Sequence, residues 1–157
     1  MTEPKASARQ RPVPQHCTSQ TLERIGVSHT DMMGIVHHSH YVVFFERGRL
    51  EYMRRRGLSY KEFVGRGLHM PVIELNVRYR KPALFDDELQ VETRLGGLTR
   101  ATVRFEYIVR RPGAAGDTPE LLLEASVQLA CVNDAQRPRG LPADVVQQLL
   151  APERAHS

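Results

Sequence analysis

Alternation between apolar and polar residues in the second half of the chain constrains the fold more than any other feature. Four segments show this period of two residues: 73–79, 89–95, 101–109 and 121–131. Because successive side chains of a strand point to opposite faces, each segment is expected to form a β-strand with one buried face. Polar residues, glycine and proline separate these segments and favour turns between them. The pattern predicts an antiparallel sheet with one covered and one wetter side.

A helical pattern precedes the four strands. Residues 41–57 contain no proline and end in a run of arginines followed by Gly57. Cationic side chains in a last turn and a glycine just beyond it are typical of a helix C-terminus. We therefore expect one long helix that covers the apolar face of the sheet. The helix face expected against the sheet carries Val43, Glu46, Leu50 and Met53.

Shorter elements complete the predicted order. Alternation over residues 21–29 predicts a first strand, although Gly26 weakens it. Residues 60–64 are expected to form a short helix capped by Ser59, and residues 142–150 a C-terminal helix. One strand, a long helix, a short helix and four further strands together predict an α+β fold with a five-stranded sheet.

The distribution of prolines and apolar residues predicts the domain organisation. Residues 1–18 contain three prolines and no periodic apolar pattern, so we expect a disordered N-terminal tail. Residues 19–157 are expected to form one domain, which is large enough to bury its own core.

Composition and charge exclude several classes of protein. The apolar runs are far shorter than the roughly 20 residues of a membrane span, and the N-terminus has no apolar secretory signal. We therefore expect a cytoplasmic protein without a membrane partner. The net charge is +4, but basic and acidic residues are interleaved, so no nucleic-acid partner is expected. Basic residues are densest over 47–66, where they suit either a phosphorylated small molecule or a solvated helix face. Cys17 and Cys131 are too few for a disulfide framework.

The most informative segment for function is SHTDMMGIVHHSHY at residues 28–41, which runs on into FFERGR at 44–49. It resembles the 4-hydroxybenzoyl-CoA thioesterase branch of the hot dog fold, including short-chain acyl-CoA relatives. The segment RYRKPA at 78–83, followed by FDDEL at 85–89, is similar to that family's turn into its third strand. The resemblance implies a hot dog fold, in which a five-stranded antiparallel sheet wraps one long central helix. It also implies a homo-oligomer, either a dimer or a tetramer.

The same resemblance implies roles for particular residues. Asp31 occupies the position of the family's catalytic carboxylate, a nucleophile or a general base toward water. The backbone amide of His38 lies where relatives polarise the thioester carbonyl. Glu46 matches a helix position that approaches the acyl group across the subunit interface. The implied substrate-binding residues are Gly34, Tyr41 and Arg100, the last in a region where relatives hold the coenzyme A phosphates.

Elementary chemistry is compatible with these roles. Thioester hydrolysis needs a carboxylate near the carbonyl carbon and donors that stabilise the developing oxyanion. An aspartate in a loop before a helix supplies the carboxylate, and the free N–H groups of the helix N-terminus supply the donors. Two alternatives stay open, which are Asp31 as a plain helix cap and Glu46 as the salt-bridge partner of an arginine.

Histidines are unusually dense around Asp31 in the sequence. Four of them lie within twelve residues of it: His29, His37, His38 and His40. Their clustering raises the hypothesis of a metal site, but no glutamate or cysteine at a recognised ligand spacing accompanies them. We therefore expect no metal and no other cofactor. His29 and His40 depart from the family pattern, which leaves the substrate preference and the pH optimum open.

These residues together predict an acyl-CoA thioesterase. The expected reaction is hydrolysis of an aromatic or a short- to medium-chain acyl-CoA to the free acid and coenzyme A. Two other functions remain as alternatives. One is hydrolysis of acyl groups from acyl carrier protein, and the other is a non-catalytic module that binds acyl thioesters or a protein.

Overall fold

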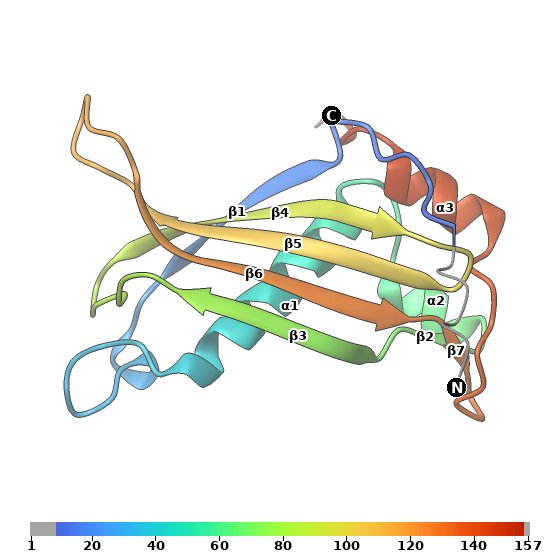
Figure 1. The fold of residues 1–157 in the computed structure, drawn as a ribbon, viewed down its shortest axis with the longest axis horizontal. Coiled ribbons are helices and arrows are strands. Elements are labelled where there is room, and N and C mark those ends of the chain that lie inside the picture. Colours follow the sequence, from blue (N-terminus) through green and yellow to red (C-terminus); the bar gives the residue numbers. More distant parts are fainter. Residues whose placement is uncertain (1–8, 156–157) are drawn as a thin grey trace, which may run out of the picture.

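A computed structural model describes residues 9–155 of the chain (Figure 1). Its main sheet has the strand order β1-β4-β5-β6-β3, and every neighbouring pair is antiparallel. The strands β2 and β7 form a second, two-stranded sheet. The elements in chain order are β1 (Thr18–Arg24), the 3-10 helix η1 (Val27–His29), α1 (His38–Arg54), α2 (Tyr60–Gly65), β2 (Leu68–His69), β3 (Val72–Tyr79), β4 (Glu88–Leu98), β5 (Thr102–Arg111), β6 (Glu120–Ala130), β7 (Val132–Asn133) and α3 (Ala143–Leu150). The predicted α+β class and five-stranded antiparallel sheet are confirmed.

Most of the predicted elements are present with small changes at their ends. The four alternating segments form β3 to β6, and α2 is capped as expected, because the Ser59 hydroxyl accepts a hydrogen bond from the Glu62 N–H. The predicted helix at 41–57 begins three residues earlier, at His38, and ends at Arg54. The first strand, predicted over 21–29, is present but shifted, since β1 spans Thr18–Arg24 and the chain then turns into η1.

The face of α1 that meets the sheet differs from the predicted one. Its buried residues are Tyr41, Phe44, Phe45, Gly48, Tyr52 and Met53. Val43, Glu46 and Leu50 lie on the exposed side, so their predicted position against the sheet is wrong. Aromatic rings decide the orientation, because Phe45 stacks on Tyr107 of β5 with 4.6 Å between ring centroids. Helix and sheet lie close together at Gly48, where a Cβ atom would overlap the Thr93 hydroxyl.

The edge strand β3 lacks the covered face that its alternation predicts. Ile73 is 57% exposed and Tyr79 is 52% exposed. The helix α1 packs instead over β1, β4 and β5, and it lies behind the sheet in Figure 1. Apolar side chains of α1 and β3 are therefore left exposed together, and we call this surface the uncovered face; it comprises Val43, Leu50, Val72, Leu75 and Tyr79.

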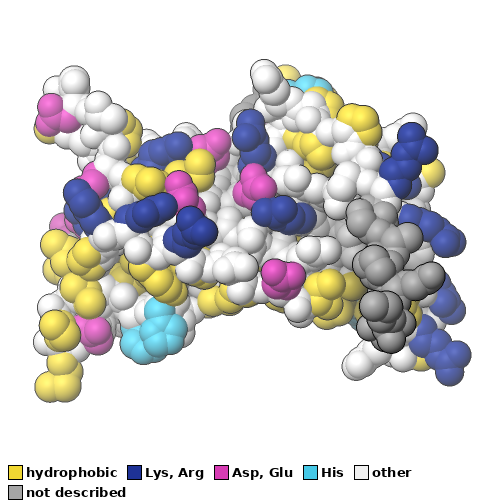
Figure 2. Space-filling view, viewed as in Figure 1, with side chains coloured by type: hydrophobic (Ala, Val, Ile, Leu, Met, Phe, Trp, Pro, Cys, Tyr) yellow, Lys and Arg dark blue, Asp and Glu magenta, His cyan; other side chains and the backbone are white. Residues whose placement is uncertain are grey.

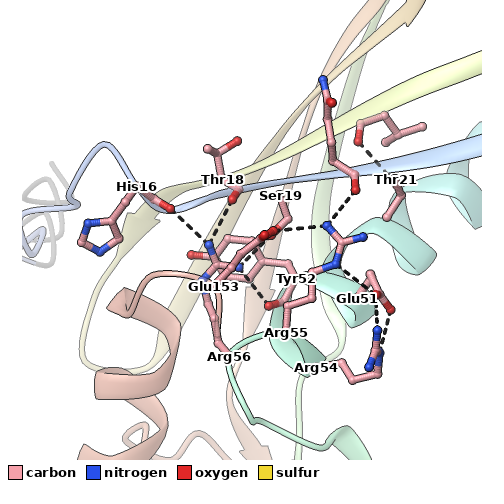
Figure 3. Close-up of polar contacts among 12 residues, drawn as sticks. His16, Thr18, Ser19, Thr21, Glu51, Tyr52, Arg54, Arg55, Arg56 and Glu153 are labelled. Atoms are coloured by element: carbon pink, nitrogen blue, oxygen red, sulfur yellow. Dashed lines mark hydrogen bonds and ion pairs between the residues drawn. The ribbon is translucent and has the colours of Figure 1, made fainter. Parts of the chain in front are cut away.

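The C-terminal end of α1 is tied to both ends of the chain by Arg56, which is only 1% exposed (Figure 3). Its guanidinium donates hydrogen bonds to four backbone carbonyls and a hydroxyl, those of His16, Thr18, Tyr52, Ala151 and Ser19. It also lies 3.5 Å from the ring centroid of Tyr52. We call this group of contacts the Arg56 cluster.

Part of the segment predicted to be a tail contacts the domain. The Arg11 N–H donates a hydrogen bond to the Leu98 carbonyl, and Cys17 is 1% exposed. Residues 1–8 of that segment lie outside the described residues, and its predicted disorder stays a prediction.

Candidate active site

Asp31 lies at the start of a tight turn between η1 and α1. The Gly34 N–H donates to the Asp31 carbonyl at 3.0 Å, and Gly34 adopts a φ of 78°, which favours glycine over residues with a side chain. The Met33 N–H donates to the Asp31 carboxylate at 2.8 Å, which fixes the side chain relative to the turn. An antiparallel bridge between Thr30 and Val36 closes the loop. The carboxylate is therefore held by its own loop while it stays exposed to solvent.

The N-terminus of α1 follows three residues after this turn. His37 is the N-cap, and its Nδ1 atom accepts a hydrogen bond from the Ser39 N–H at 3.3 Å. No acceptor for the His38 N–H is found among residues 9–155. Free N–H groups and the positive end of the helix dipole make this position favourable for a developing negative charge.

Asp31 and His38 line one cleft of about 550 Å³. Tyr41 of α1 and Tyr79 of β3 form part of its wall, with 5.8 Å between their ring centroids. Burial raises the pKa of the Tyr41 hydroxyl, so this group stays protonated at neutral pH. Figure 2 shows histidine side chains gathered beside hydrophobic atoms at the end of the molecule where α1 begins. The structure thus brings together three of the residues predicted from the sequence: Asp31, His38 and Tyr41.

The other three predicted residues do not line this cleft. Gly34 shapes the turn, and no atom lies within 4 Å of the position that its Cβ would take. Glu46 is exposed and lines a neighbouring cavity, eight residues or about 12 Å further along α1 than His38. Arg100 lies beyond the far end of β4, about 35 Å away along the strand, where its carbonyl accepts a hydrogen bond from the Leu141 N–H.

Two basic residues, which the sequence offers only as candidate contacts to the coenzyme A phosphates, also belong to the cleft. Arg80 and Lys81 line it, directly after β3. Both are paired with carboxylates of β6, Arg80 with Glu124 at 3.6 Å and Lys81 with Glu120 at 2.8 Å. Both belong to the turn motif RYRKPA, which places its charges where the edge strand β3 ends.

The basic stretch 47–66 supports the solvated-face alternative over a phosphate site. Arg47 pairs with Glu23 at 3.0 Å, and Arg66 pairs with Asp144 at 2.8 Å. Arg54 and Arg55 both pair with Glu51. Ion pairs within the chain therefore satisfy most of these charges.

The histidines near Asp31 contact one another rather than a common centre. The rings of His29 and His40 lie 5.1 Å apart, edge to face, and the His29 Nδ1 atom accepts a hydrogen bond from the Gly26 N–H. Within the described residues, no three histidine, cysteine or acidic side chains are placed to hold a metal ion together.

The cleft as a whole offers a carboxylate, a free N–H and an aromatic wall, which suits attack on a polarised carbonyl. None of the described helices is long and apolar enough to span a membrane.

Comparison with known proteins gives a consistent result. The family described as the thioesterase-like superfamily matches residues 25–149. The acyl-CoA thioester hydrolase YbgC of Escherichia coli O157:H7 is 32% identical over 78% of this chain and 89% of its own length. The DHNA-CoA thioesterase of Staphylococcus aureus is 28% identical, with a TM-score of 0.72 over 79% of this chain and 80% of that one. The 4-hydroxybenzoyl CoA thioesterase of Pseudomonas sp. strain CBS-3 shares the fold at 23% identity, with a TM-score of 0.75 over 83% of this chain and 98% of that one.

Proposed function

The chain belongs to the thioesterase-like superfamily, and from this premise we propose that it is an acyl-CoA thioesterase with Asp31 as its catalytic carboxylate. The observation that carries the proposal is the shared cleft of Asp31 and the free N–H of His38. This pairing supplies a nucleophile or base and an oxyanion donor within one short segment.

The reaction needs little beyond these groups. The thioester carbonyl oxygen accepts a hydrogen bond from the His38 N–H, and the negative charge that develops on it is stabilised by the N-terminus of α1. The Asp31 carboxylate then either attacks the carbonyl carbon or takes a proton from a water molecule that attacks. In the first case the C–S bond breaks to give a mixed anhydride of the acyl group with Asp31, and water then hydrolyses this anhydride to the free acid. In the second case the water oxygen forms the new C–O bond as the C–S bond breaks. In both cases a proton from the water passes to the thiolate of coenzyme A.

The acyl group is proposed to be aromatic or a short to medium aliphatic chain. Tyr41, Tyr79 and Val36 give the cleft an apolar wall that suits either kind of group. The relatives from E. coli and S. aureus, an acyl-CoA thioester hydrolase and a DHNA-CoA thioesterase, support coenzyme A as the carrier. A cytoplasmic location and the domain boundary at residue 19 stay predictions.

Homo-oligomerisation is part of the proposal. The uncovered face exposes apolar side chains of α1 and of the edge strand β3, whose backbone groups are free to pair with another strand. Two copies that pair β3 antiparallel would bury this face and wrap both helices, as the hot dog arrangement requires. The same pairing would bring Glu46 of one copy toward Asp31 of the other. Dimers of such pairs, which give a tetramer, are compatible with it.

Assembly is tested by Leu75→Asp in β3, which places a charge in the centre of the uncovered face. We expect a monomer with at least tenfold lower activity, measured by sedimentation and by thioester hydrolysis at equal concentration. A matched change on the other face of β3, Asn76→Asp, should leave the assembly intact. A fully active Leu75→Asp monomer would contradict the two-copy site.

The activity itself is tested with a panel of aromatic and aliphatic acyl-CoAs, followed through the release of free thiol. The native protein is compared with Asp31→Asn and with Asp117→Asn, which makes the same change at an exposed position of the β5–β6 loop. We expect turnover by the native protein and the control and an at least hundredfold loss in Asp31→Asn. If the protein hydrolyses only thioesters of acyl carrier protein, its substrate is an acyl carrier protein thioester and not an acyl-CoA. If it binds acyl thioesters without any turnover, it is a binding module and not an enzyme.

A further inference from the structure

The ring and the carbonyl of His37 decide which N–H group at the start of α1 stays free. The Nδ1 atom accepts a hydrogen bond from the Ser39 N–H at 3.3 Å, and the carbonyl accepts one from the His40 N–H at 3.1 Å. The His38 N–H, directly after the cap, has no acceptor in the described part of the chain. The donor that stays free therefore belongs to the residue that shares a cleft with Asp31.

The cap requires one protonation state of the His37 ring. Because Nδ1 uses its lone pair to accept from the Ser39 N–H, the ring is neutral and carries its proton on Nε2. A further proton adds only at Nδ1, where it occupies that lone pair and removes the cap. The Ser39 hydroxyl lies 2.8 Å from Nδ1 and accepts a hydrogen bond from the protonated atom. Protonation thus turns the ring from an acceptor for the helix backbone into a donor to a side chain.

The backbone of His37 is held by contacts that do not involve its ring. The His37 N–H donates to the His29 carbonyl at 3.0 Å, and the preceding Val36 N–H donates to the Ala83 carbonyl at 2.9 Å. A change of the side chain therefore leaves the path of the loop into α1 in place and alters the cap alone.

Charged groups of several elements surround the cap. Asp31 of the preceding loop contributes a negative charge to the cleft, and Arg80 and Lys81 after β3 contribute positive ones. On α1 itself, the His38 ring lies 4.1 Å and the His40 ring 6.4 Å from the His37 ring, between centroids. Burial raises the pKa of the two tyrosine hydroxyls of the cleft, which therefore stay neutral; they belong to Tyr41 and Tyr79. Whatever the balance of these charges, a proton on His37 removes the same hydrogen bond.

We propose that His37 is a positioning residue, whose neutral ring caps α1 so that the His38 N–H meets the thioester carbonyl, and whose protonation switches this positioning off. The inference rests on the proposed thioesterase activity. With the cap in place, the first turn is ordered and only the His38 N–H is offered to the developing oxyanion. Without it, the turn frays and the Ser39 N–H competes for the same oxygen. Since histidine changes its charge between about pH 5 and 8, turnover should fall as the solution becomes acidic.

The test compares the native protein with His37→Ser and His37→Ala at pH 7.5 and 5.5, on the acyl-CoA that the native protein hydrolyses best. Serine accepts from the same N–H but gains no proton in this range. At pH 7.5 we expect the kcat of His37→Ser to lie within about twofold of the native value. The kcat of His37→Ala should be about fivefold lower with KM nearly unchanged, as expected for a lost cap that acts in the transition state. At pH 5.5 the native protein should fall to the level of His37→Ala, while His37→Ser keeps its advantage.

Two controls separate the cap from other effects of pH. His37→Asn supplies a second N-cap that gains no proton in this range and should behave as His37→Ser does. His16→Ser changes an exposed histidine outside the cleft and should keep the native pH dependence. Equal pH dependence of the native protein and His37→Ser, or a native kcat in His37→Ala at pH 7.5, overturns the proposal.

Nuclear magnetic resonance tests the cap without any turnover. If the native protein hydrolyses no thioester, the proposed function fails, and the ¹⁵N signals of the His37 ring still report where its proton lies. At pH 7.5 we expect the proton on Nε2, and the Ser39 N–H signal should shift as Nδ1 gains a proton on acidification. In His37→Ser this shift should be absent. A proton on Nδ1 at pH 7.5, or an equal shift in both proteins, would refute the cap by itself.

Discussion

The two ends of α1 are built in opposite ways. At the C-terminal end, the buried guanidinium of Arg56 is surrounded by five acceptors and an aromatic ring (Figure 3). At the N-terminal end, Asp31 and His38 face an open cleft, and the His38 N–H has no acceptor in the described chain.

The C-terminal end of α1 therefore serves stability, and its N-terminal end serves the reaction. A donor that is fully satisfied by its own chain holds elements together but has nothing left to offer a substrate. A free N–H and an exposed carboxylate contribute little to folding and remain available for a reacting group. We therefore expect substitutions at the C-terminal end to change the free energy of unfolding, and substitutions at the N-terminal end to change the rate of catalysis.

Arg56→Met is expected to have the largest effect. The change removes the donor of five hydrogen bonds and leaves buried carbonyls without partners, so the free energy of unfolding should fall by about 3–5 kcal/mol. Urea denaturation measures this loss. Arg54→Met, at an exposed surface ion pair two residues earlier, should lower the free energy of unfolding far less. Equal losses in the two variants would contradict the conclusion that the Arg56 cluster stabilises the fold more than a surface ion pair does.

Asp31→Asn is expected to show the reverse behaviour. Activity should fall at least hundredfold, equivalent to about 2.7 kcal/mol of transition-state stabilisation. The free energy of unfolding should change by less than about 0.5 kcal/mol, because the amide oxygen of Asn can still accept the hydrogen bond from the Met33 N–H. Thioester hydrolysis and urea denaturation on the same preparation measure both quantities. A large loss of stability in Asp31→Asn would contradict the division between a stabilising C-terminal end and a catalytic N-terminal end of α1.

His37→Ala tests whether the N-terminal end needs its cap. The change removes the Nδ1 acceptor of the Ser39 N–H, and we expect a loss of about 1 kcal/mol in the free energy of unfolding. His37→Ser keeps an acceptor at the N-cap position and should restore most of that stability. Thermal denaturation of the three proteins checks the order, and an Ala variant as stable as the Ser variant would show that the cap contributes nothing.

The smallest effect is expected from the pH dependence of Glu51 at the C-terminal end. Hydrogen bonds from Arg54, and then from Arg55, lower the pKa of its carboxyl group from 4.5 to about 2. Since the pKa is lowered in the folded state, this stabilisation is complete above about pH 5 and is lost as the pH falls toward 2. The partly exposed group should contribute on the order of 1 kcal/mol. Urea denaturation between pH 2 and 7 should therefore show a weaker acid destabilisation for Glu51→Gln than for the native protein, and identical slopes would contradict it.

Much of the fold could be predicted because its signals are local. The period of two in β3 to β6 and the arginine–glycine end of the helix depend only on neighbouring residues and their backbone preferences. The first strand was misplaced because its end depends on a distant residue. The Ile25 N–H donates to the Asp87 carbonyl, which lies beyond β3, and the chain turns after it.

The candidate site was predicted only in part for a similar reason. Asp31, His38 and Tyr41 belong to one short segment, so the sequence motif already placed them near one another. Arg80 and Lys81 reach the same cleft from the end of β3, and Arg100 lies at the other end of the sheet. Spacing along the chain does not show which end of a strand faces the helix N-terminus.

The sequence by itself therefore determined the α+β class, the antiparallel sheet and the segment that carries the candidate carboxylate, because periodicity and motif are properties of adjacent residues. The tertiary structure decided which face of α1 meets the sheet, since Phe44 and Phe45 fill that space and leave Glu46 outside. It also decided which arginines between 47 and 66 are buried and which partners each one has. Arg56 is buried among carbonyls and Arg49 borders a cavity, because burial and partners depend on residues far apart in the chain that packing brings together.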